Sequence, residues 1–156
     1  MGELTLRKEL GDLSSIVCFR SIVTGLESVM GKDAASGNLI RAGRLRGIEV
    51  AKKLGLSKTD KAMSEWSAIV ADALGTNGTR LCTIIKLEEE DGIYRVFLSD
   101  TICSADEEPG STRKLSFTQG AIQGVIEEAT GHRLSGKQIG SVLRGDDYDI
   151  AEFKIR

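Results

Sequence analysis

The chain has 156 residues, 40% apolar and 28% charged, with 18 Gly but only one Pro, one His and one Trp. This length suits one domain whose single hydrophobic core can form without disulfides or a metal. The formal net charge of −2 argues against general nucleic-acid binding, which needs a strongly basic surface. Because we find neither a membrane-length apolar run nor an apolar secretory segment at the N-terminus, we expect a cytoplasmic protein.

Few residues are suited to metal binding or catalysis. Cys18, Cys82 and Cys103 lie far apart in the sequence, so they predict neither a zinc site nor a disulfide framework, and we expect buried, reduced thiols. His132 follows Gly131 at a predicted helix end, where an imidazole is better suited to capping than to catalysis. We therefore predict no catalytic residue and no metal site.

Three helices are predicted in the first half of the chain. The first spans residues 13–30, with Asp12 as its N-cap, and carries an unusually wide apolar face. The second spans residues 33–54, and the third begins after Thr59 or Asp60 and ends at residue 74. The wide face of the first helix predicts burial against more than one neighbour, within the fold or in a dimer.

Glycines interrupt the apolar face of the second predicted helix. Gly43 and Gly47 lie near the middle of that face, although glycine in a helix interior costs ~1 kcal/mol relative to alanine. Either another backbone approaches closely there, or the glycines leave room for a ligand. Leu45 and Ile48 lie among charged residues on the opposite side and indicate a second contact.

After residue 79 the pattern changes to strands. Residues 81–87 and 93–98 flank Asp91-Gly92, which predicts a hairpin, and residues 104–111 form an acidic loop that we expect to be solvated. A fourth helix follows from Ser116 or Phe117 to Thr130, with Gly120 and Gly124 nearly opposite its apolar face. Two more strands, 138–143 and 150–155, complete the order ααα-ββ-α-ββ. This order predicts an α+β fold, with helices packed on an antiparallel sheet of about four strands.

Two parts of the chain resemble a known family. Residues 117–133, the run Arg144-Gly145-Asp146-Asp147-Tyr148 and the closing Phe153 resemble the 4-vinyl-reductase-type domain, also called the hydrocarbon-binding domain. Residues 39–47 resemble the glycine-spaced helix of that family and of the related subunits of the TRAPP trafficking complex. The resemblance covers about residues 13–155, and we predict that residues 1–156 form one domain of this type.

The resemblance implies a hydrophobic, fatty or tetrapyrrole-like ligand held between helices and sheet, and a dimer formed through the N-terminal helices. Family members in phototrophs are linked with chlorophyll metabolism or photosystem assembly. Many members carry cysteines around the Gly-Asp-x-Tyr turn, where this chain has Ser141 and Asp149. We therefore expect no cysteine-dependent metal site at that end of the domain.

The leading hypothesis is non-catalytic binding of a hydrophobic or tetrapyrrole-like small molecule. The candidate pocket residues are Gly43, Gly47, Trp66, Gly120 and Gly124. The alternative is a dimeric, TRAPP-like protein-interaction scaffold whose pocket is filled by its own side chains. A vinyl-group reductase ranks third and would require a bound redox cofactor.

We also predict a homodimer, because the first two helices carry more apolar surface than a small domain can cover. The predicted interface residues are Phe19, Leu26, Leu45 and Ile48. The expected partners are thus a hydrophobic small molecule, a second copy of the chain and, for the scaffold hypothesis, another protein. Nucleic acid is not among them.

Overall fold

The computed structural model describes residue 9 and residues 15–156. In chain order the elements are α1 (Ile16–Met30), α2 (Lys32–Lys53), α3 (Met63–Leu74), β1 (Thr83–Glu90), β2 (Ile93–Ser99), α4 (Phe117–Thr130), β3 (Leu134–Gly140), the short 3-10 helix η1 (Val142–Arg144) and β4 (Asp149–Ile155). This order and the α+β fold class are as predicted from the sequence. The predicted N-cap Asp12 lies outside the described residues, and Ser15 caps α1 by accepting a hydrogen bond from the Val17 N–H.

The third strand was predicted too late in the sequence. It begins at Leu134 rather than at residue 138, and residues 142–144 form η1 instead of its end. The reason is the left-handed conformation of Gly131 (φ 78°), which ends α4 and lets the chain enter the sheet within three residues. Pairing with β4 then fixes the strand, with Leu134 opposite Ile155.

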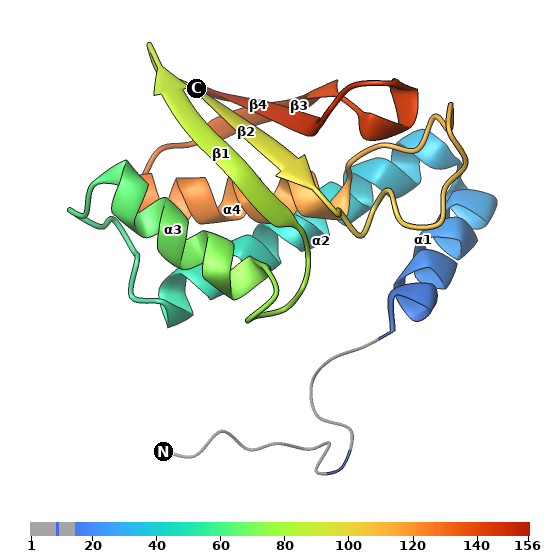
Figure 1. Cartoon of the computed structure of the whole chain (residues 1–156), viewed down its shortest axis with the longest axis horizontal. Helices are drawn as coiled ribbons and strands as arrows, with labels where there is room; N and C mark the ends of the chain where they lie inside the picture. The colour runs from blue at the N-terminus through green and yellow to red at the C-terminus, as the bar shows by residue number, and fades with distance from the viewer. Residues whose placement is uncertain (1–8, 10–14) are drawn as a thin grey trace.

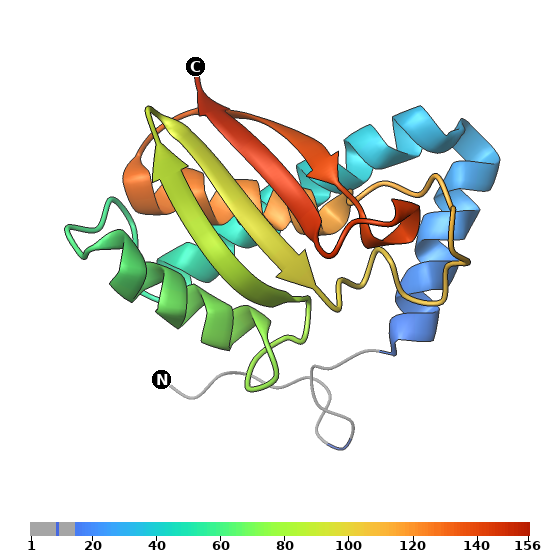
Figure 2. The same ribbon diagram turned by 45° about the horizontal axis from the view of Figure 1, so that its top comes forward.

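The sheet is antiparallel throughout, in the order β1-β2-β4-β3. The predicted hairpin joins β1 to β2 through Asp91 and Gly92, whose positive φ angles of 51° and 76° suit a type I′ turn. Along β2, Tyr94, Val96 and Leu98 are buried on the face toward the helices. Figures 1 and 2 show α3 and α4 lying along that face.

Helix α4 is the central element of the fold. Every residue from Thr118 to Glu127 is buried. One side of the helix contributes Ile122 and Ile126 to the core, and the other carries Gly120 and Gly124 against α2. The molecule therefore has the sheet on one side of α4 and α2 on the other (Figure 1).

The backbones of α2 and α4 touch at glycines. At Gly43, an added Cβ atom would lie 2.0 Å from the carbonyl oxygen of Phe117. At Gly47, it would lie 2.0 Å from the carbonyl oxygen of Ala121. On α4, a Cβ atom added at Gly120 would lie 2.0 Å from the carbonyl oxygen of Ile40, and one added at Gly124 would lie 2.1 Å from that of Arg44. No side chain fits at these distances, so the opposing helix backbone occupies the space that each missing Cβ leaves.

A partly buried ion pair reinforces this contact. Arg44 of α2 donates from Nε to Glu127 Oε2 of α4 at 2.6 Å, and Glu127 also accepts from the Leu134 N–H at 2.9 Å and from Gln123 Nε2 at 3.1 Å. Burial alone would raise the pKa of Glu127, but these hydrogen bonds and the charge of Arg44 outweigh it and lower the pKa. Glu127 therefore links α2, α4 and the start of β3.

The glycine contact predicts opposite effects for two alanine substitutions in α2. Gly47→Ala should lower the free energy of unfolding by about 3 kcal/mol or more, because its Cβ would meet backbone rather than a movable side chain. Gly37→Ala, the matched control, has nothing within 4 Å and should raise it by about 0.5–1 kcal/mol through helix propensity. Urea unfolding followed by circular dichroism measures both, and equal effects would contradict the contact.

The lowered pKa of Glu127 predicts a pH-dependent contribution to stability. A carboxylate whose pKa falls on folding stabilises the protein above the unfolded value, about 4.3, and loses this contribution as pH falls toward the folded value. Glu127→Gln should therefore cost about 2–3 kcal/mol at pH 7, since Arg44 loses a charged partner. The difference in free energy of unfolding between the variant and wild type should become smaller below about pH 4. A difference in stability that does not change with pH would contradict the lowered pKa of Glu127.

Candidate functional site

The predicted pocket residues fall into two separate places. The four glycines come together in the α2–α4 contact, where they face the opposing backbone. Trp66 of α3 is 4% exposed and faces a crevice on the other side of α4, between α3 and the sheet. None of the four glycines lines that crevice.

The crevice beside Trp66 is apolar and narrow. Its volume of about 10 Å³ is room for about one water molecule. Apart from Ser67, its lining consists of apolar side chains from α3, α4 and the first two strands: Trp66, Val70, Ile84, Leu87, Val96, Ile122, Val125 and Ile126. In this structure the space between helices and sheet is therefore filled by the protein's own side chains.

The predicted interface residues differ in how accessible they are. Phe19 packs edge-on against Phe117, with ring centroids 5.6 Å apart, so it is turned toward the protein interior. Leu26 and Ile48 are half-buried, whereas Leu45 is 59% exposed. The wide apolar face of α1 is thus divided: Val23 is buried, but Ile22 and Val29 are exposed.

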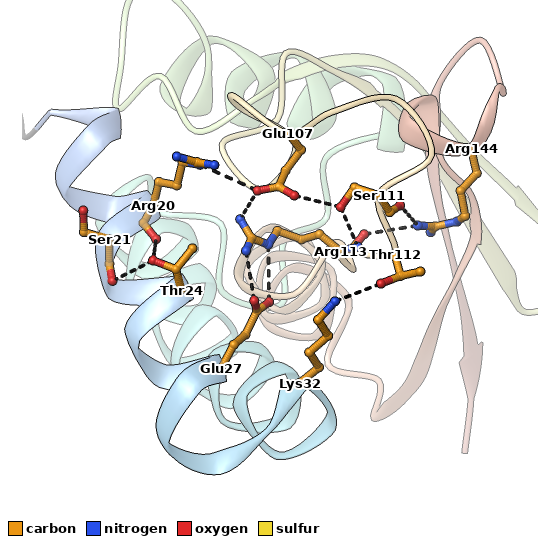
Figure 3. Close-up of polar contacts among 10 residues, drawn as sticks. All are labelled: Arg20, Ser21, Thr24, Glu27, Lys32, Glu107, Ser111, Thr112, Arg113 and Arg144. Carbon is orange, nitrogen blue, oxygen red and sulfur yellow. Dashed lines mark hydrogen bonds and ion pairs between the residues drawn. The ribbon is translucent and has the colours of Figure 1, made fainter.

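A polar cluster holds α1 against the loop between β2 and α4 (Figure 3). The Arg113 side chain is only 9% exposed and lies between two carboxylates. It donates to Glu27 of α1 from Nε at 3.3 Å and from Nη2 at 2.9 Å, and to Glu107 from Nη1 at 2.6 Å. Such paired, charged hydrogen bonds fix geometry as well as adding energy.

Three further cations border this cluster. Arg20 Nε lies 3.6 Å from Glu107 Oε1. Lys32 Nζ donates to the Thr112 hydroxyl at 3.1 Å, and Arg144 Nη1 donates to the carbonyl oxygens of Ser111 and Arg113 at 3.1 and 3.2 Å. Figure 3 shows these side chains converging from α1, α2, η1 and the loop.

The expectation that the whole acidic loop is solvated was wrong for Glu107. Its side chain is 14% exposed because it accepts from Arg113 and from the Ser111 hydroxyl. Both partners are close in sequence, but the cluster is completed only by Glu27, which is 86 positions from Arg113.

Hydroxyl groups surround a buried carboxylate near the turn where many members of the resembled family carry cysteines. Asp149 Oδ2 accepts from Thr101 and Ser104 at 2.9 and 2.8 Å, and its Oδ1 accepts from the Val142 N–H at 3.0 Å. Among the described residues, no group of three or more His, Cys, Asp and Glu side chains is placed to hold a metal ion.

The sequence suggested that all three cysteines are buried, but only two of them are. Cys82 and Cys103 are buried, but Cys18 is exposed on α1. Burial raises the pKa of Cys82 to about 12, with a smaller contribution from Cys103. Cys82 is therefore a protonated, unreactive thiol at neutral pH.

No protein-family model and no curated protein sequence matches the chain. Solved structures do match. The phenol-responsive sensory domain of the transcription activator PoxR, with phenol, is 16% identical with a TM-score of 0.65, over 92% of this chain and 76% of that one. Trafficking protein particle complex subunit 3 from Naegleria fowleri, covalently bound to palmitic acid, is 17% identical with a TM-score of 0.59, over 90% and 92%.

These low identities show a shared fold and no more. The chain thus has the α+β fold of a small-molecule-responsive sensory domain and of a trafficking-complex subunit. None of its described helices is long and apolar enough to cross a membrane.

Proposed function

We propose that this chain is a non-enzymatic interaction module that forms a homodimer through α1. The exposed apolar side of α1 carries this proposal. Ile22 is 58% exposed and Val29 is 85% exposed, although both are large aliphatic residues within a regular helix. Contiguous apolar surface of this kind usually marks an interaction site.

The exposed side of α1 has the spacing of a helix-pairing seam. Cys18, Ile22, Gly25 and Val29 follow one another at intervals of four, three and four residues, which places them on one stripe of the helix. Gly25 has nothing within 4 Å, so a second helix backbone has room to approach there. Two copies of α1 related by a two-fold axis would each cover the other's stripe.

Leu45 extends the proposed interface onto α2, as expected from the sequence. On α1, however, the stripe of Ile22 and Val29 takes the place of Phe19 and Leu26, which are turned toward the interior or half-buried. The filled space between helices and sheet also favours an interaction scaffold over an open ligand pocket.

The dimer proposal predicts that charges on the α1 stripe separate the subunits. Wild type should sediment as a dimer at micromolar concentration, and Ile22→Glu with Val29→Glu should sediment as a folded monomer. Ile85→Glu, at a residue 46% exposed on β1, is the matched control and should remain dimeric. Leu45→Lys with Ile48→Lys tests the part contributed by α2. A monomeric wild type would overturn the dimer, and a dimeric α1 variant would exclude the stripe.

A second function, binding of a small apolar molecule, is favoured by the lining of the Trp66 crevice. Apolar side chains from α3, α4, β1 and β2 converge there. Of two proteins that share the fold, one is a phenol-responsive sensory domain with phenol and the other is covalently bound to palmitic acid, which supports the choice of ligand class. Since the crevice holds only about one water molecule, α3 would have to move away from the sheet to admit a ligand.

This second proposal predicts ligand-dependent fluorescence of Trp66, the only tryptophan. Phenol, palmitic acid or a bilin should change the emission, the bilin testing the tetrapyrrole class and its implied link with chlorophyll metabolism or photosystem assembly. Ser67→Phe, within the crevice lining, should weaken binding at least about tenfold, because its ring would occupy the opening. Ser64→Phe, on the exposed side of α3, should not. An unchanged spectrum with all three probes would exclude the crevice as a site for them.

A further inference from the structure

A polar groove adjoins the N-terminal half of α2. It consists of two adjoining depressions of about 160 and 610 Å³, which share Asp33, Ser36 and Lys114. The smaller one reaches Ser116, the N-cap of α4, and the larger one reaches Gln119 and Arg144. The larger volume is in the range of small-molecule sites. We call the two depressions together the Lys114 groove.

Three buried polar side chains in the Lys114 groove lack a protein partner. Ser36, Ser116 and Gln119 are 9%, 4% and 5% exposed, and their side chains form no hydrogen bond with any described residue. The other glutamines of this region do have protein partners: Gln123 donates from Nε2 to Glu127 and Leu134, and Gln138 bonds to Leu115 and Gly140. Their polar atoms open onto the groove and are not sealed in the interior, so all three are available to bind a ligand or ordered water.

The N-terminus of α4 lies at the same groove. This 14-residue helix has no side-chain cap at Ser116 and no acidic residue in its first turn. Its first N–H groups therefore keep their positive partial charge without the usual compensation. Uncompensated helix N-termini are suited to anions.

The charged residues around the groove leave a positive excess. Within the described chain, Lys32 and Arg144 bond only to neutral oxygens, those of Thr112, Ser111 and Arg113. Lys114 pairs with Asp33 at 2.9 Å, but both side chains are largely exposed, so the pair is weak. Glu27 also borders the groove, but its carboxylate is already engaged by Arg113.

We propose that the Lys114 groove binds the oxyanion of a carboxylate or phosphate group on a small molecule. Lys114 and Arg144 supply charge at the rim, whereas Ser36, Ser116, Gln119 and the first turn of α4 supply hydrogen-bond donors at the floor. This site is separate from both the α1 stripe and the Trp66 crevice, so it stands or falls independently of them.

The test is an NMR titration of the full chain with inorganic phosphate and with acetate, each compared with sodium chloride at equal ionic strength. At least one oxyanion should shift the Gln119 side-chain amide and the backbone amides of residues 116–119 in a saturable way. Stronger binding of phosphate would indicate a phosphorylated ligand, and stronger binding of acetate a carboxylate ligand. Equal shifts with chloride would overturn the proposal, as would no saturable shift with either oxyanion.

Variants locate the binding. Gln119→Leu and Arg144→Gln should each weaken it at least about tenfold, because each removes donors to a charged group. Ser36→Ala removes only a hydroxyl and should weaken oxyanion binding less. This variant still tests the groove if Gln119→Leu or Arg144→Gln unfolds the chain. Arg46→Gln, at a partly exposed arginine of α2 outside the groove, should bind like wild type. Unchanged binding in folded Gln119→Leu and Ser36→Ala proteins would overturn the assignment.

Discussion

The backbone contact between α2 and α4 is the constraint on which the rest of the structure depends. At four glycines, a single added carbon would lie 2.0–2.1 Å from a carbonyl oxygen of the opposite helix. Each of these glycines weakens its own helix by ~1 kcal/mol, so close packing must offset that cost. Because α4 lies between α2 and the sheet, the same contact positions the core side chains of α4. These side chains help to fill the space between the helices and the sheet.

Helix α1 lies outside this contact and is held differently. Its attachment relies on Phe19 against Phe117 and on Glu27 with the buried Arg113, while only Val23 is buried along its length. The remaining apolar surface of α1, including Ile22 and Val29, is exposed. The candidate sites lie around the α2–α4 pair, on α1, beside Trp66 and in the Lys114 groove.

Much of the fold could be predicted from the sequence because its signals are local. Asp91-Gly92 specifies the hairpin, and the glycines within α2 and α4 indicate a close approach that the structure contains. Helical periodicity did not reveal which part of the wide apolar face of α1 turns inward, and Phe19, predicted at a dimer interface, packs on Phe117 within the chain. The choice depends on a residue almost a hundred positions away.

The polar sites could not be predicted for the same reason. Arg113 meets Glu27 across 86 positions, and the Lys114 groove joins side chains from α2, α4 and η1. Single charged or hydroxyl residues in loops usually remain solvated, and only the tertiary fold shows which of them are buried. Most of the secondary structure can therefore be predicted here from short patterns, whereas these polar sites cannot.

Native-state hydrogen exchange tests the central role of the α2–α4 contact most directly. Amides of α2 and α4 around Gly43, Gly47, Gly120 and Gly124 should exchange only through global unfolding, with the slowest rates in the protein. Amides of α1 and α3 should exchange faster, through local opening. Exchange in the middle of α2 as fast as in α1 would contradict the account, because the two backbones would then separate without unfolding the core.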